Sequence, residues 1–98
     1  MTISRNKDGA ALTLAVEGRL DTITAPELEA VLKEELEGVE SLTFDLAGLS
    51  YISSAGLRVL LSAQKRMNVQ GAMKVTGVGE IVMEIFDVTG FTDILTIE

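Results

Sequence analysis

Two neighbouring hydroxyl groups, those of Ser53 and Ser54, are the best candidates in this chain for a chemical role. They follow an apolar strand pattern and precede an amphipathic helix pattern, so both are expected at a helix N-terminus. Free backbone N–H groups and the positive end of the helix dipole make such a position favourable for an added phosphate. Serine is also a favoured N-cap residue, worth about 1 kcal/mol. One cap needs one serine, and spacing alone ranks capping ahead of signalling.

The composition removes most catalytic mechanisms from these serines. The chain has no histidine and no cysteine, which excludes histidine-based triads, imidazole acid–base catalysis and thiolate chemistry. The residues around Ser54 do not form the G-x-S-x-G turn of hydrolases. Asp21 and Asp45 fall near expected strand ends without a spacing that pairs them, and the glycines at 77 and 79 lack the lysine of a phosphate loop. We therefore predict a protein that is not an enzyme and has no metal site and no cofactor.

The charge balance limits the partners. Fifteen acidic residues against eight basic ones give a formal charge of −7. An acidic surface repels phosphate backbones and anionic lipids, so we expect neither nucleic acid nor a membrane as partner, but proteins with a basic docking surface. The N-terminus lacks a signal-peptide pattern and no apolar stretch is long enough to span a bilayer. We expect a cytoplasmic protein.

Alternating strand and helix patterns predict one α/β domain over residues 1–98, a length that suits a single core. Asp8-Gly9 between two extended runs indicates a hairpin. Thr24 with Glu27 matches a capping box at the start of the first helix. The expected order is β-β-α-β-α-β-α-β, with strands at 2–5, 11–17, 41–46, 72–76 and 94–97, and helices at 24–38, 54–71 and 80–88. Such an order implies a mixed sheet, antiparallel at the opening hairpin and parallel elsewhere.

Three segments of the chain resemble the STAS-domain anti-sigma-factor antagonists. Residues 45–57, followed by Val59-Leu60-Leu61, are similar to the family signature of an aspartate at a strand end, a hydroxyl-rich turn and Gly-Leu opening a helix. Gly18-Arg19-Leu20-Asp21 resembles the Gly-x-Leu-Asp segment before the family's first helix. Residues 86–91 resemble the end of its third helix. The motifs occur in the family's order over nearly the whole chain.

The resemblance implies a fold and a function. The fold is a small mixed sheet with helices packed mainly on one side. The function is partner switching, in which the unphosphorylated domain binds a serine-kinase anti-sigma factor and thereby frees the sigma factor. That kinase phosphorylates one serine in the turn and a serine phosphatase reverses the reaction. Matched position by position, the acceptor is Ser54, followed by Ala55 as the small residue and Gly56 as the glycine.

The chain departs from the family pattern in two places. Many members have aspartate immediately before the acceptor, where this chain has Ser53, so Ser53 is an alternative acceptor. The family also commonly continues into another helix after the last strand, whereas the sequence ends at Glu98. From this second departure we expect a packing surface that is exposed or used by a partner.

The resemblance also implies a docking surface around the serine turn, made of Asp21, Thr22, Ser53, Ser54, Ala55, Gly56 and Arg58. Phosphate on Ser54 would place negative charge beside the loop of Asp21 and oppose binding by repulsion and desolvation rather than by refolding. For Arg58, the plain interpretation is the solvated stripe of an amphipathic helix. Two other functions remain open: a STAS accessory subunit that binds the ATPase of a transporter, and a small nucleotide-binding domain.

Overall fold

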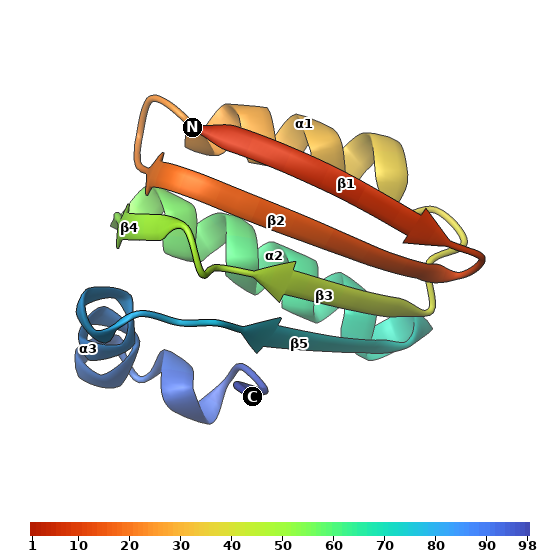
Figure 1. The fold of residues 1–98 in the computed structure, drawn as a ribbon. Coiled ribbons are helices and arrows are strands. Elements are labelled where there is room, and N and C mark those ends of the chain that lie inside the picture. The colour runs from red at the N-terminus through yellow and green to blue at the C-terminus, as the bar shows by residue number, and fades with distance from the viewer.

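A long central strand organises the fold of this protein. The computed structural model describes residues 1–98 (Figure 1) and contains, in chain order, β1 (Thr2–Asp8), β2 (Ala11–Leu20), α1 (Ala25–Glu35), β3 (Ser41–Asp45), β4 (Leu49–Ile52), α2 (Ser54–Gln70), β5 (Ala72–Thr76), α3 (Glu80–Thr89) and the 3₁₀ turn η1 (Phe91–Asp93). The five-stranded sheet has the order β1-β2-β3-β5, and β4 pairs with the far end of β2. Only β1 is antiparallel to its neighbour. The mixed α/β sheet predicted from the sequence is confirmed.

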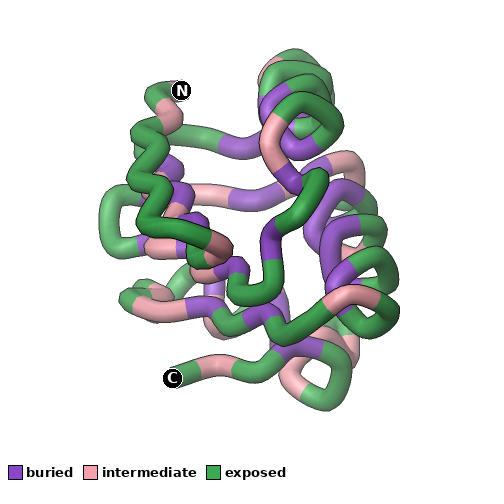
Figure 2. The backbone as a smooth tube through the Cα atoms, turned by 90° about the vertical axis from the view of Figure 1, so that its right-hand side faces the viewer, coloured by how far each residue is buried: buried purple, intermediate pink, exposed green.

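Both α1 and α2 cover the same face of the sheet (Figure 1), and the buried residues lie mostly where these helices and the strands face each other (Figure 2). Alternation along the strands explains this arrangement, because successive side chains of a strand point to opposite faces. The core contains 25 buried apolar residues; those of β2, β3 and β5 are Leu12, Leu14, Val16, Leu20, Leu42, Phe44, Met73 and Val75. The opposite face carries Thr13, Thr43 and Lys74 at the alternate positions. These side chains are polar, so no helix has to pack on this face to shield it from water.

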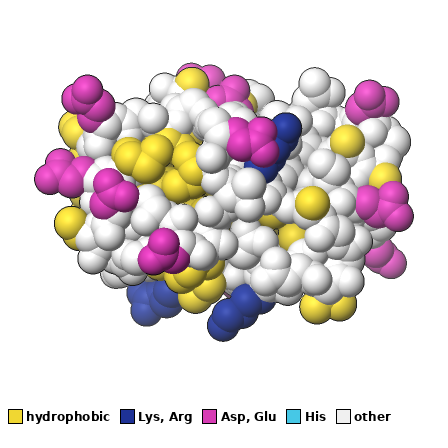
Figure 3. Space-filling view, turned by 90° about the horizontal axis from the view of Figure 1, so that it is seen from below, with side chains coloured by type: hydrophobic (Ala, Val, Ile, Leu, Met, Phe, Trp, Pro, Cys, Tyr) yellow, Lys and Arg dark blue, Asp and Glu magenta, His cyan; other side chains and the backbone are white.

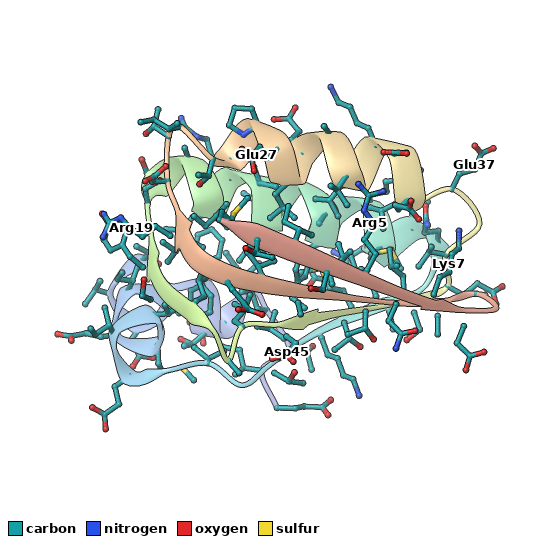
Figure 4. All side chains as sticks on the ribbon, turned by 45° about the horizontal axis from the view of Figure 1, so that its top comes forward. Arg5, Lys7, Arg19, Glu27, Glu37 and Asp45 are labelled. Atoms are coloured by element: carbon teal, nitrogen blue, oxygen red, sulfur yellow. The ribbon has the colours of Figure 1, made fainter.

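An ion-pair cluster fastens the edge strand β1 to the first helix. Arg5 projects from β1 toward α1 (Figure 4), where its Nη1 lies 2.9 Å from Glu35 Oε1 and 3.4 Å from Glu34 Oε2. These groups are partly exposed, so each pair contributes little on its own, about 0–1 kcal/mol. The position of α1 is set mainly by its buried residues Leu28, Val31 and Leu32, and the ion pairs add a contact at the edge of the sheet. None of the three α-helices combines the length and the apolarity needed to cross a bilayer.

Several element boundaries differ from those predicted. β2 continues to Leu20, three residues beyond its predicted end, and residues 49–52, which lie outside every predicted strand, form β4. Pairing of β4 with β2 stabilises both extensions. A final strand at 94–97 was also wrong. The chain curls after Gly90, with Leu95 N–H donating to the Phe91 carbonyl, so only Ile97 reaches β5, through a single bridge to Val75.

Candidate functional site

The two serines occupy different positions at the start of α2. Ser53 is the N-cap: its backbone is extended, and its hydroxyl accepts a long hydrogen bond of 3.4 Å from the Gly56 N–H. Ser54 is the first helical residue and is exposed. The structure therefore gives the capping role to one serine and leaves the other at the surface.

The start of α2 is packed closely on the sheet at Gly56, which is buried. A Cβ atom at Gly56 would lie 2.7 Å from Leu20 Cγ, 2.8 Å from Ile52 Cγ1 and 3.0 Å from the Leu20 carbonyl oxygen. These distances are shorter than van der Waals contact, so only glycine fits without a shift of the core. The close packing fixes the position of the Ser53-Ser54 turn relative to the ends of β2 and β4.

The loop after β2 is held by the carboxylate of Asp21. Its Oδ1 accepts hydrogen bonds from the backbone N–H groups of Ile23 at 3.0 Å and Thr24 at 3.1 Å. The Thr24 hydroxyl accepts in turn from the Asp21 N–H at 2.9 Å and lies 2.8 Å from the Arg19 carbonyl oxygen, to which it donates. The predicted capping box is wrong, because the Thr24 side chain turns back into this loop and makes no bond to the first turn of α1.

The same hydrogen bonds keep Asp21 charged. The backbone N–H of Thr24 contributes most to lowering the pKa of the Asp21 carboxyl below its usual value, with further contributions from the Ile23 N–H and the Thr24 hydroxyl. The Arg19 guanidinium, whose Nε lies 3.8 Å from Asp21 Oδ2, acts in the same direction. Partial burial opposes these effects without overcoming them. Asp21 is therefore an anion at neutral pH.

Parallel pairing brings the two loops together. β2 and β4 run in the same direction with Leu20 opposite Ile52, and the Ser53 N–H donates to the Leu20 carbonyl at 2.9 Å. Asp21 and Thr22 therefore follow one strand end, and the serine turn follows its neighbour. Of the seven residues predicted for the docking surface, Gly56 is buried, whereas Thr22, Ser54 and Arg58 are exposed and the others are partly exposed.

Sequence reasoning missed one pair beside this site. The Arg19 guanidinium lies 4.4 Å from the centre of the Tyr51 ring, a cation–π distance, and Arg19 projects at the β4 end of the sheet (Figure 4). The two residues are opposite each other in the β2–β4 register. Residues 49–52 do not alternate as a strand would, so the sequence offered no local signal for this pair.

Comparison with known proteins identifies the family. The family model described as the STAS domain matches residues 2–98. The chain belongs to the STAS-domain family. This STAS domain is 37% identical over 82 residues to the anti-sigma-B factor antagonist of Staphylococcus epidermidis, covering 82% of this chain and 76% of that protein. The resemblance seen in the sequence is thereby confirmed.

Solved structures share the fold of this STAS domain. It is similar to an anti-sigma factor antagonist from Mycobacterium paratuberculosis, with a TM-score of 0.88, 21% identity, and coverage of 98% of this chain and 83% of that one. It is also similar to the Bacillus cell fate determinant SpoIIAA in its phosphorylated form, with a TM-score of 0.77 and 14% identity. That match covers 99% of this chain and 91% of SpoIIAA.

Proposed function

We propose that this STAS domain is an anti-sigma-factor antagonist that works by partner switching and is phosphorylated on Ser54. One observation supports the site above all: Ser53 caps α2, while the hydroxyl next to it is exposed at the first helical position. The names of the relatives support the function, because the Staphylococcus protein is an anti-sigma-B factor antagonist. They favour this function over a transporter subunit or a nucleotide-binding domain.

A phosphate on Ser54 would be accommodated without refolding. It would add about −1.5 to −2 charges at a helix N-terminus, where backbone N–H groups and the helix dipole stabilise an anion. Arg58 follows Ser54 by four residues on the same helix, and side chains at this spacing are neighbours on the helix surface. Arg58 is exposed and can pair with the phosphate.

The added charge would act on the partner. The surface around Ser54 already includes the ionised Asp21, so phosphorylation strengthens a negative field at the docking surface. A partner that binds the unmodified surface then meets repulsion and an unfavourable desolvation of the phosphate. In this proposal the partners are a serine-kinase anti-sigma factor and a serine phosphatase, and the protein acts in the cytoplasm without catalysing a reaction itself.

The phosphoacceptor can be mapped directly. Wild type, Ser53→Ala and Ser54→Ala are incubated with the anti-sigma kinases of the host and ATP, and phosphate is located by mass spectrometry. We expect phosphate on Ser54 in wild type and in Ser53→Ala, and none in Ser54→Ala. Phosphate that persists in Ser54→Ala and disappears in Ser53→Ala would move the site by one residue. Phosphate on neither serine with any kinase would refute the switch.

The effect of charge can be separated from the effect of shape. Ser54→Asp adds a negative charge, whereas Ser54→Asn adds a side chain of nearly the same size without one. We expect the kinase to bind Ser54→Asp at least about tenfold more weakly than wild type, and Ser54→Asn about as well as wild type, by calorimetry. Equal affinity for the Asp and Asn variants would show that charge at Ser54 does not control binding.

A further inference from the structure

The two helices that cover the sheet leave a groove between them. It has a volume of about 370 Å³ and is lined by side chains of both α1 and α2. Its floor is apolar and closely packed, since five of its lining residues are almost fully buried: Ala25, Leu32, Leu36, Val59 and Ala63. A hollow with an apolar floor and a few polar and charged groups at its rim is a common form of binding site.

The charged residues of the groove have the opposite sign to the rest of the molecule. Lys33, Arg58 and Arg66 line it, and the only carboxylate among its lining residues is that of Glu29, which lies 3.6 Å from Lys33 Nζ. Neither Arg58 nor Arg66 belongs to any of the ion pairs of the structure. In a chain with a formal charge of −7, this groove is a local concentration of positive charge.

The spacing of these cations indicates the shape of the ligand. Arg58 and Arg66 are eight residues apart on α2, about 12 Å along the helix axis, and Lys33 is on the facing helix. Both arginines are exposed, so they do not converge on one buried point as they would around a compact anion. Charges spread along an apolar groove fit an elongated ligand with an apolar stripe and acidic groups beside it.

We propose that the groove between α1 and α2 binds an acidic amphipathic segment of a partner protein. Its apolar side chains would cover Pro26, Ala55 and the aliphatic stems of the groove's cations, which are the accessible apolar groups of the lining, and its carboxylates would pair with Arg58 and Arg66. The inference rests on the proposed function, since it names the part of the switching partner that this domain recognises. It departs from the basic docking surface expected from the net charge, because this groove is lined mainly by cations.

The groove is connected to the proposed phosphorylation site. Its lining includes Thr22, Ala55 and Arg58, which also belong to the predicted docking surface around Ser54. A phosphate on Ser54 would pair with Arg58, four residues later, and so remove one of the groove's unpaired cations. Phosphorylation and binding in the groove would therefore compete for the same guanidinium group.

Two peptides test the chemistry of the groove. Both are synthetic helices of about 18 residues with leucines in one stripe, and they carry either glutamate or lysine on the flanking positions. Titrated into the ¹⁵N-labelled domain, the glutamate peptide should shift the amide signals of residues lining the groove, and salt should weaken its binding. The lysine peptide should not bind there. Shifts confined to other surfaces, or equal shifts with both peptides, would overturn the proposal.

Two adjacent residues provide a matched pair of variants. Arg66 lines the groove and is remote from Ser54 along α2, whereas Lys65 is exposed on the same helix turn but does not line it. Arg66→Glu and Lys65→Glu change the net charge equally. We expect Arg66→Glu to weaken binding of the glutamate peptide about tenfold and Lys65→Glu less than about twofold. Circular dichroism checks that both variants are folded. Equal losses of affinity in two folded variants would mean that only net charge matters, and would refute the proposed binding in the groove.

Failure of the groove and failure of the switch are distinguishable. The peptide titration contains no kinase, so a failure of the peptide to bind in the groove would say nothing against phosphorylation of Ser54. Conversely, a domain that no kinase modifies could still bind the glutamate peptide in the groove. Spectra that depend on protein concentration without any peptide would identify a second copy as the occupant and would also contradict the proposal.

Discussion

Two strand-to-helix junctions lie side by side in this domain and differ in how their polar groups are used. In the junction from β2 to α1, the Asp21 carboxylate accepts from two backbone N–H groups of its own loop. In the junction from β4 to α2, the only side-chain cap is the 3.4 Å bond from Gly56 to Ser53, and Ser54 is exposed. A closed, internally bonded loop thus stands next to an open helix N-terminus. The Asp21 loop is therefore held in one conformation by its own hydrogen bonds, whereas the N-terminus of α2 can accept an anion.

Gly56→Ala should disturb the open junction most. The new methyl group would meet Leu20 and Ile52 below 3 Å, and overpacking of this kind lowers the free energy of unfolding by about 1–3 kcal/mol. Urea unfolding followed by circular dichroism measures this loss. Gly79→Ala is the control: Gly79 is the N-cap of α3, with φ −75° and nothing within 4 Å of the added Cβ. The loss of a better N-cap residue is offset by the lower entropy of the unfolded chain, so a net change below about 0.5 kcal/mol is expected. Similar losses in both variants would show that the close contact does not matter.

Asp21→Ala should disturb the closed junction by leaving the N–H groups of Ile23 and Thr24 without their acceptor. We expect a lower Tm than wild type, with a smaller loss than Gly56→Ala and a larger one than Ser53→Ala. Asp21→Asn, which keeps an acceptor oxygen but not the charge, should lie between wild type and Asp21→Ala. A Tm unchanged in Asp21→Ala would contradict the view that this loop is held by its own carboxylate.

The pH dependence of Asp21 sharpens this contrast. The pKa of Asp21 is lower in the folded protein than in the unfolded chain, whose reference value is about 3.9. Its contribution is therefore fully present above that value and is lost as the pH falls through the folded pKa. The difference in Tm between wild type and Asp21→Ala should narrow between pH 6 and pH 3. A difference independent of pH would mean that the charge of Asp21 contributes nothing.

Replacing either serine should have the smallest effects on stability among these variants, although the two serines have different functional roles. Ser53→Ala removes an N-cap and should cost about 0.5–1 kcal/mol, at the low end for such a cap because the bond is long. Ser54→Ala removes an exposed side chain and should change the free energy of unfolding by less than about 0.5 kcal/mol. Thermal unfolding of the two variants measures both. A larger loss for Ser54→Ala would reverse the roles given to the two residues.

Hydrophobic periodicity predicted the architecture well, because the elements that decide it are strongly patterned. Leu12, Leu14 and Val16 alternate, and all three are buried in β2. The start of α2 near Ser54 was also predicted from sequence, since a serine followed by a helical apolar pattern is a local signal. The family motif added which of the two serines to test.

Features that depend on tertiary partners were missed. β4 has only four residues, including polar Ser50 and Tyr51, and it is a strand because β2 pairs with it. Thr24 has the right spacing for a capping box, but the Asp21 loop offers its hydroxyl better partners. The basic groove requires α1 and α2 side by side, which no local pattern specifies. Prediction failed where the outcome depends on residues outside the local pattern: in the paired strand for β4, in the preceding loop for Thr24 and on the facing helix for the groove.

The surface at the α3 end of the molecule differs from the groove in the kinds of side chain that it exposes. Viewed from below, apolar side chains gather on this surface with acidic side chains around them (Figure 3). Ile81 and Val88 of α3 are 63% and 78% exposed, and α3 contains no lysine or arginine. The charged side chains of α3 are therefore all acidic, those of α2 are all basic, and α1 carries four carboxylates and one lysine.

The ten residues of β2 also have a consequence for how the chain folds. β2 pairs with β1 through a tight hairpin, whereas its parallel pairing with β3 and β4 requires the chain to return through the helical connection that contains α1. Local contacts form at lower entropic cost than non-local ones. We therefore expect the hairpin to form early and β2 to serve as the template in the folding transition state. Substitutions in β2 should then slow folding, whereas substitutions in α3, which packs against the end of β4, should mainly accelerate unfolding.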